Sequence, residues 1–156
     1  MNEKLAEGVF QVGVMVSDVD ECLRLFHDVL GLEIVFDARS IPQREKGLTG
    51  VDLAIMDVLM LHGDDGVDLE IHHYVDPPAK PMPPQNHNEI GSMHFMLRVK
   101  DIYKVREKVE ALGYQFMIPV VVSERIPGFK YTYFRGPDGM MVELHEGLSR
   151  IPKDQG

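Results

Sequence analysis

The sequence predicts an α+β fold of two βαβββ modules in tandem, forming a cupped, mostly antiparallel sheet around a central cavity. The order strand, helix and about three strands occurs twice along the 156 residues. A proline-rich segment separates the two copies. Both copies close on the same motif, Asp-Gly, three residues, Glu, aliphatic, His, at residues 65–72 and 138–145.

Composition indicates a globular protein of ordinary make-up, long enough for one domain or for two small modules sharing a core. Apolar residues make up 44% and charged residues 26% of the chain. The formal net charge of −9 and the scattered Lys and Arg argue against nucleic acid and anionic membranes as partners. The single cysteine, Cys22, excludes an intrachain disulfide and suits a reducing compartment. Since we find no secretory signal and no apolar run of membrane-spanning length, we expect a cytoplasmic protein.

The first module is expected at residues 1–76. Its first strand, at residues 9–16, is rich in β-branched residues and alternates two faces. Ser17 or Asp18 can cap a helix at 19–30, where apolar residues recur at helical spacing and Gly31 follows. The remaining expected elements are a strand at 32–36, a polar loop at 39–49, strand-like segments at 51–56 and 58–61 with a bend near Asp57, and the closing strand at 67–72.

A linker at residues 77–90 and a second module at 91–148 follow, with a tail at 149–156. Five prolines within residues 77–84 exclude a helix or a central strand and predict a stiff, extended segment. The second module is expected to contain a strand at 92–99, a helix at 102–112 capped by Asp101 and ended by Gly113, a strand region at 114–122, a strand at 130–135, a turn at 137–139 and the closing strand.

The two copies can be overlaid residue by residue. The first copy is about ten residues longer, and we place the extra residues mainly in the loop at 39–49. The matched pairs are Gln11 with His94, Asp18 with Asp101, Gly66 with Gly139, Glu70 with Glu143, and His72 with His145.

Polar residues on the first and last strands of the modules form a candidate site. In each module the aliphatic faces suit packing against the helix, so the opposite faces line a concave surface. Gln11, Glu70, His94 and Glu143 lie on those opposite faces and converge if the modules are related by a pseudo-twofold axis. One imidazole nitrogen and three oxygen donors suit a hard to borderline divalent metal, with coordination positions left open. His72, His145, Arg98 and Met96 share these faces and are candidate substrate contacts.

Several motifs resemble the vicinal-oxygen-chelate superfamily, which includes glyoxalase I, methylmalonyl-CoA epimerase, extradiol dioxygenases and antibiotic-resistance proteins. The first motif is the end of the first strand at residues 16–18, together with the helix end at Leu30-Gly31. The others are the first strand of the second module, at 94–101, and the final turn and strand, at 138–143. The resemblance covers residues 9–147 and implies metal ligands at Gln11, Glu70, His94 and Glu143. Glutamine occurs at the first position in the eukaryotic type of glyoxalase I, whereas epimerases tend to have glutamine at the position of Glu70.

The resemblance implies a lyase or isomerase of glyoxalase or epimerase type that depends on one divalent ion, Ni, Co, Mn, Zn or Fe. Such an enzyme moves a proton next to a carbonyl of a small oxygen-chelating substrate. Glu143 is the first candidate for the base and Glu70 the second. We also expect a homodimer, and the site closes either within one chain or across two.

Two other functions stay open. A metal-free protein of the bleomycin-resistance kind would sequester a ligand, and a divergent ring-cleaving dioxygenase would bind iron through His94 and one or two glutamates. Outside the site, His62, His73 and His87 are expected on the surface and Cys22 in the core.

Overall fold

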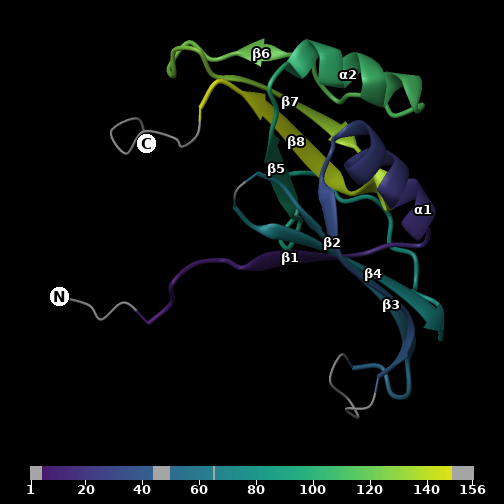
Figure 1. Cartoon of the computed structure of the whole chain (residues 1–156). Coiled ribbons are helices and arrows are strands. Elements are labelled where there is room, and N and C mark those ends of the chain that lie inside the picture. The colour runs from purple at the N-terminus through teal and green to yellow at the C-terminus, as the bar shows by residue number, and fades with distance from the viewer. Residues whose placement is uncertain (1–4, 44–49, 65, 149–156) are drawn as a thin grey trace. The chain divides into compact units, whose positions relative to one another are not determined.

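The computed structural model describes residues 5–43, 50–64 and 66–148. The chain divides into two compact units, Met1–Lys80 and Pro81–Gly156. Each unit has the strand–helix–three-strand order and forms one four-stranded mixed sheet (Figure 1). The predicted α+β class with two βαβββ modules is therefore confirmed.

The sheet of the first unit has the strand order β1-β4-β3-β2. Strand β1 pairs with β4 in parallel, and the other two pairings are antiparallel. The elements are β1 (Gln11–Met15), α1 (Val19–Cys22), the π-helical segment η1 (Leu23–Val29), β2 (Glu33–Pro42), β3 (Ile55–His62) and β4 (Asp68–Asp76).

The helix of the first unit is capped by Asp18, one of the two predicted candidates, and buries most of its predicted apolar stripe. The Asp18 carboxylate accepts a hydrogen bond from the Glu21 amide at 3.0 Å. Cys22, Leu25 and Phe26 are fully buried. The helix widens into π geometry after its first turn, and the amide of Leu30 donates to the carbonyl of Leu25 at 3.0 Å.

Two predictions for the first unit are wrong. Strand β2 continues to Pro42, through the first part of the predicted loop at 39–49, of which residues 44–49 lie outside the described chain. Residues 51–54 are not a strand, and β3 runs without a break through Asp57. The Asp57 carboxylate explains the continuity, because it accepts from the Ser40 amide at 2.8 Å and lies 3.0 Å from Nδ1 of His73. One side chain thus joins β2, β3 and β4.

The sheet of the second unit repeats the same plan, with the order β5-β8-β7-β6 and β5 parallel to β8. The Asp101 carboxylate caps the helix by accepting from the Lys104 amide at 3.0 Å. The elements are β5 (His94–Arg98), α2 (Ile102–Ala111), β6 (Val121–Val122), β7 (Lys130–Arg135), the 3₁₀ turn η2 (Pro137–Gly139) and β8 (Met141–Glu146).

The strand region predicted at 114–122 is mostly irregular. Only Val121–Val122 form a strand, and Phe116 adds a single bridge to Phe134. The Arg106 guanidinium donates to the Ile118 carbonyl at 3.0 Å and lies over the Phe116 ring. The Thr132 hydroxyl donates to the same carbonyl, so side chains satisfy an acceptor that a regular strand would offer to a neighbouring backbone.

The strand registers bear out the overlay of the two copies. In each unit the first and last strands pair in parallel, and equivalent residues of the two units have equivalent partners. The paired residues are Gln11 with Asp68, Gly13 with Glu70 and Met15 with His72 in the first unit, and His94 with Met141, Met96 with Glu143 and Arg98 with His145 in the second.

The predicted aliphatic face is buried on the last strand of each unit and partly buried on the first strand. Leu69 and Ile71 on β4, and Val142 and Leu144 on β8, are at most 5% exposed. Because side chains alternate along a strand, Glu70 and Glu143 are held on the opposite faces.

Over the described residues, every helix is too short or too polar to cross a bilayer.

Candidate metal and substrate site

The first half-site, Gln11, Glu70 and His72, lies on β1 and β4. Nε2 of Gln11 donates to Oε2 of Glu70 at 2.5 Å. Nε2 of His72 lies 2.9 Å from the same oxygen but forms no hydrogen bond with any described residue, although it is buried. The side chains of Glu70 and His72 are 17% and 19% exposed, so the carboxylate has restricted contact with water.

A glycine faces the carboxylate of this half-site. Gly13 is the register partner of Glu70, and a Cβ atom at Gly13 would lie 3.4 Å from Oε2 of Glu70. Met96 holds the equivalent position opposite Glu143 in the second unit. The two half-sites therefore share a backbone plan but differ in the space beside the carboxylate.

The second half-site, His94, Tyr133 and Glu143, lies on β5, β7 and β8. Nε2 of His94 lies 3.2 Å from Oε2 of Glu143, whose side chain is 5% exposed. Tyr133 is the register partner of Glu143 on β7, and its hydroxyl donates a hydrogen bond to the carboxylate. Burial raises the pKa of Glu143, and the contacts with Tyr133 and His94 oppose that rise. Burial and the bond to Glu143 also raise the pKa of Tyr133.

Sequence analysis missed two residues of this half-site. Tyr133 could have been found by pairing 130–135 with 141–146 across the turn, which places it opposite Glu143. His87 is exposed, as predicted, yet its ring centroid lies 5.2 Å from that of His94 and 6.1 Å from that of Tyr133. No sequence pattern places His87 there, since its position depends on the path of the segment between the units' strands.

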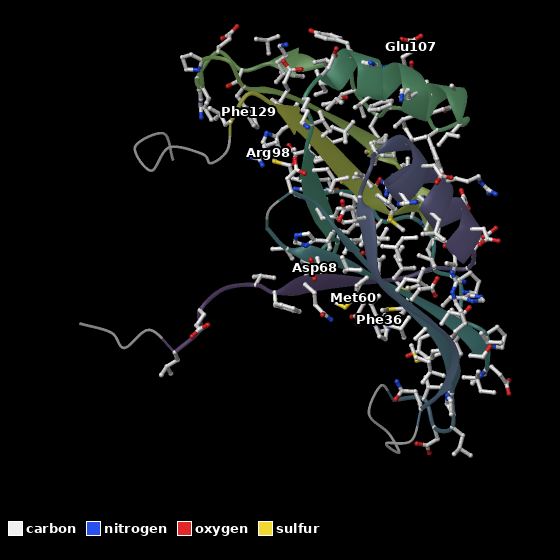
Figure 2. All side chains as sticks on the ribbon, in the orientation of Figure 1. Phe36, Met60, Asp68, Arg98, Glu107 and Phe129 are labelled. Carbon is white, nitrogen blue, oxygen red and sulfur yellow. The ribbon has the colours of Figure 1, made fainter. Side chains whose placement is uncertain are left out.

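The other predicted contacts lie on the same strands. His145 follows Glu143 by two residues, and its Nδ1 is buried without a hydrogen-bond partner among the described residues. Burial, and then the charge of Arg98, lower the pKa of His145. Arg98 is the register partner of His145 and extends from β5 (Figure 2). Met96, opposite Glu143, is 38% exposed.

The two histidines of the first unit that were predicted at the surface, His62 and His73, are partly exposed and paired with carboxylates. His73 is half-buried and bonded to Asp57. His62 is half-buried, and its Nδ1 lies 2.5 Å from Oδ1 of Asp68, the aspartate labelled in Figure 2. Each imidazole is thus held by a carboxylate on the adjacent strand.

The types of donor suit a divalent cation, whereas their placement within each unit gives only a pair of candidate ligands. The predicted ligands come together as two pairs, Gln11 with Glu70 and His94 with Glu143. Among the described residues, no cluster of three or more His, Cys, Asp or Glu side chains is close enough to hold a metal. A carboxylate as buried as Glu143 is costly to keep ionised, and a bound cation would remove that cost.

Comparison with known proteins identifies the family. The sequence model of the Glyoxalase/Bleomycin resistance protein/Dioxygenase superfamily matches residues 8–144. The chain belongs to this superfamily. The predicted resemblance is thereby confirmed, and the superfamily includes enzymes of several kinds.

Three similar proteins illustrate the range of this superfamily. A 2-epi-5-epi-valiolone epimerase of Actinomyces sp is 25% identical, covering 96% of this chain and 85% of its own. The crystal structure of a glyoxalase family protein from Bacillus cereus superimposes with a TM-score of 0.82 at 22% identity, covering 96% and 99% of the two chains. The fosfomycin resistance protein FosX of Listeria monocytogenes, complexed with Mn(II) and sulfate, gives a TM-score of 0.61 at 14% identity, covering 93% and 96%.

Proposed function

We propose that this protein is a divalent-metal-dependent isomerase of the epimerase type, acting next to a carbonyl group of a small, oxygen-rich substrate. The observation that carries the proposal is the buried Glu143 carboxylate, in contact with His94 and Tyr133. The equivalent carboxylate, Glu70, is paired with Gln11 in the first unit. The similarity to the Actinomyces epimerase supports the choice of reaction within the superfamily.

Gln11, Glu70, His94 and Glu143 would hold the metal. Since Nε2 of Gln11 donates to Glu70, its Oε1 is the atom left to coordinate. When bound, a divalent ion would act as a Lewis acid that polarises the substrate carbonyl and makes the adjacent carbon more acidic. Three oxygen donors and one imidazole suit Mn, Co, Ni, Zn or Fe.

We assign the proton transfer to Glu143 first and to Glu70 second. Burial raises the pKa of Glu143, which favours its carboxylate as a base. A bound cation would lower that pKa, so Glu143 would act as the base only once a substrate oxygen replaces it as a ligand. The hydroxyl of Tyr133 donates to this carboxylate and holds its orientation. Glu143 takes the proton from the carbon next to the carbonyl, and return of a proton to the other face of that carbon inverts it. Glu70, whose side chain is 17% exposed, is the candidate for returning that proton.

Arg98, His72, His145 and Met96 are assigned to the substrate. The Arg98 guanidinium can bind a carboxylate or phosphate through two parallel hydrogen bonds. The buried Nε2 of His72 and Nδ1 of His145, both without hydrogen bonds among the described residues, can pair with substrate oxygens. Met96 offers an adaptable apolar contact.

Metal analysis tests the proposal directly. Protein purified without added metal, and the same protein after exposure to Mn, Co, Ni, Zn or Fe, should contain about one ion per chain. The variants Glu143→Ala and His94→Ala should lose the ion, because each removes a ligand. Glu107→Ala, which truncates an exposed glutamate on α2 (Figure 2), is the control and should keep it.

The reaction is tested with the metal-loaded protein and 2-epi-5-epi-valiolone in deuterium oxide. NMR should show deuterium entering at the carbon next to the carbonyl. Failure to bind any of the five metals would contradict the proposal and favour a ligand-sequestering protein. Oxygen uptake with iron, without deuterium exchange, would instead indicate the ring-cleaving class.

A further inference from the structure

A short segment of the second unit, residues 84–92, is fixed against the turn between β7 and β8; we call it the strap. The Arg135 guanidinium donates to the carbonyls of Gln85 at 2.6 Å and Gly139 at 3.0 Å. Pro84 packs on Gly139, where a Cβ atom would lie 2.6 Å from Cγ of Pro84. The start of the strap is therefore anchored a few residues from Glu143 in the sequence.

Hydrogen bonds within the strap fix the backbone on both sides of His87. The amide of Asn86 donates to the Glu89 carboxylate at 2.6 Å, and the amide of Ser92 donates to the Glu89 carbonyl at 3.0 Å. The Ser92 hydroxyl donates to the His87 carbonyl at 3.2 Å. A backbone held in this way presents the His87 side chain at low entropic cost to any ligand.

The His87 imidazole lies at the exposed side of the second half-site. His87, His94 and Tyr133 form a cluster of three rings with centroid separations of 5.2, 5.7 and 6.1 Å. His94 and Tyr133 both contact the buried Glu143 carboxylate, and His87 interacts with it electrostatically. His87 itself is exposed to solvent.

His87 differs from its two neighbours in its hydrogen bonding. Nε2 of His94 and the hydroxyl of Tyr133 are both directed to Glu143. Neither ring nitrogen of His87 takes part in a hydrogen bond with another described residue. His87 therefore offers a ring N–H group on the exposed side of the half-site.

We propose that His87 is a substrate-binding residue, whose imidazole N–H donates a hydrogen bond to a substrate oxygen beside Glu143. This inference rests on the proposed function, because it takes Glu143 as the centre of the reaction. The strap would then contribute to substrate specificity. A substrate with an oxygen atom beside His87 would gain a hydrogen bond that an alkyl analogue cannot form.

Oxalate is a suitable probe, because it is planar, anionic and carries adjacent oxygen atoms. Its affinity for the Mn²⁺-loaded full-length protein is measured by calorimetry, and Mn²⁺ affinity is measured separately. His87→Ala, and His87→Phe, which keeps a ring but no N–H, should each weaken oxalate binding about tenfold or more. Both should leave Mn²⁺ affinity within about twofold, whereas His87→Gln, which keeps an N–H donor, should retain most of the oxalate affinity.

Ile90→Ala is the control, since it truncates a fully exposed side chain in the same strap. Thermal unfolding of each variant shows whether the fold is kept. Unchanged oxalate affinity in His87→Ala or His87→Phe overturns the inference, and so does a wild-type protein that binds Mn²⁺ but not oxalate. A large fall in Mn²⁺ affinity in these variants would make His87 a metal ligand and also overturn it. Failure of the wild type to bind Mn²⁺ or any other metal overturns the proposed function and this inference with it.

Discussion

Asp57 links three neighbouring strands in the sheet of the first unit. Its side chain is 13% exposed and joins three strands through Ser40 and His73. The hydrogen bond from His73, followed by that from the Ser40 amide, lowers the pKa of Asp57. A carboxylate with a lowered pKa stabilises the folded state above its ordinary pKa of about 4, and this contribution is lost as the pH falls through the folded-state value.

Asp57→Asn should therefore change both the stability and its dependence on pH. At neutral pH we expect the free energy of unfolding to fall by about 1–3 kcal/mol, the usual cost of a lost charge-assisted hydrogen bond. From neutral to acid pH the variant should lose less stability than the wild type, since its amide does not titrate. Urea unfolding at several pH values measures both effects. Asp52→Asn, at an exposed position, is the control, and equal acid sensitivity of Asp57→Asn and the wild type would refute the assignment.

At the scale of elements, the two helices begin in the same way. Asp18 and Asp101 each have extended backbone geometry and accept a hydrogen bond, at 3.0 Å, from the amide three residues later. Sequence analysis predicted the Asp101 cap and narrowed the first cap to Ser17 or Asp18, because a cap depends on local chemistry alone.

Removal of either helix cap should lower the free energy of unfolding by about the same amount. Asp18→Ala and Asp101→Ala are each expected to lower the free energy of unfolding by about 1 kcal/mol. Asp→Asn at the same positions should retain most of that stability, since the amide oxygen still accepts. Guanidinium unfolding of the four variants measures the differences. A loss as large with Asn as with Ala would show that the charge, not the acceptor, matters.

The elements that sequence analysis placed wrongly depend on contacts between distant residues. The extension of β2 to Pro42 and the unbroken β3 both follow from Asp57, which is bonded to residues 17 positions before it and 16 after it. The loss of strand structure after Gly113 follows from Arg106 and Thr132, which bind the Ile118 carbonyl. In contrast, β7 has its predicted bounds, because alternation and the following turn are local features.

In the candidate site, too, residues set by the sequence repeat were predicted and residues set by distant contacts were missed. Repetition in the sequence placed Gln11, Glu70, His94 and Glu143 on matched strands, and the structure pairs Gln11 with Glu70 and His94 with Glu143. Convergence of all four on one metal stays a prediction. Tyr133 and His87 were missed, because one is specified by cross-strand register and the other by the path of the strap.

At the scale of the whole molecule, the repeat predicts how substitutions at Gln11 change the affinity for metal. The registers of the two units are equivalent, so Gln11 stands in the first unit where His94 stands in the second. Gln11→His should raise the affinity for Zn²⁺ or Ni²⁺ several-fold, because imidazole suits these ions better than an amide oxygen. Gln11→Ala should weaken binding. Equilibrium dialysis measures both variants, and a Gln11→His protein that binds as weakly as Gln11→Ala would count against Gln11 as a ligand.

The hydrogen bond from Tyr133 to Glu143 also gives the protein an optical reporter. The chain has no tryptophan and five tyrosines, so its ultraviolet emission comes from tyrosine alone. A hydrogen bond from its hydroxyl to a carboxylate quenches the fluorescence of a tyrosine. Protonation of that carboxylate, or binding of a cation to it, therefore changes the fluorescence intensity of the tyrosine. Tyr133 therefore reports the state of Glu143 without a dye or label, and its share of the emission is the difference between the wild type and Tyr133→Phe.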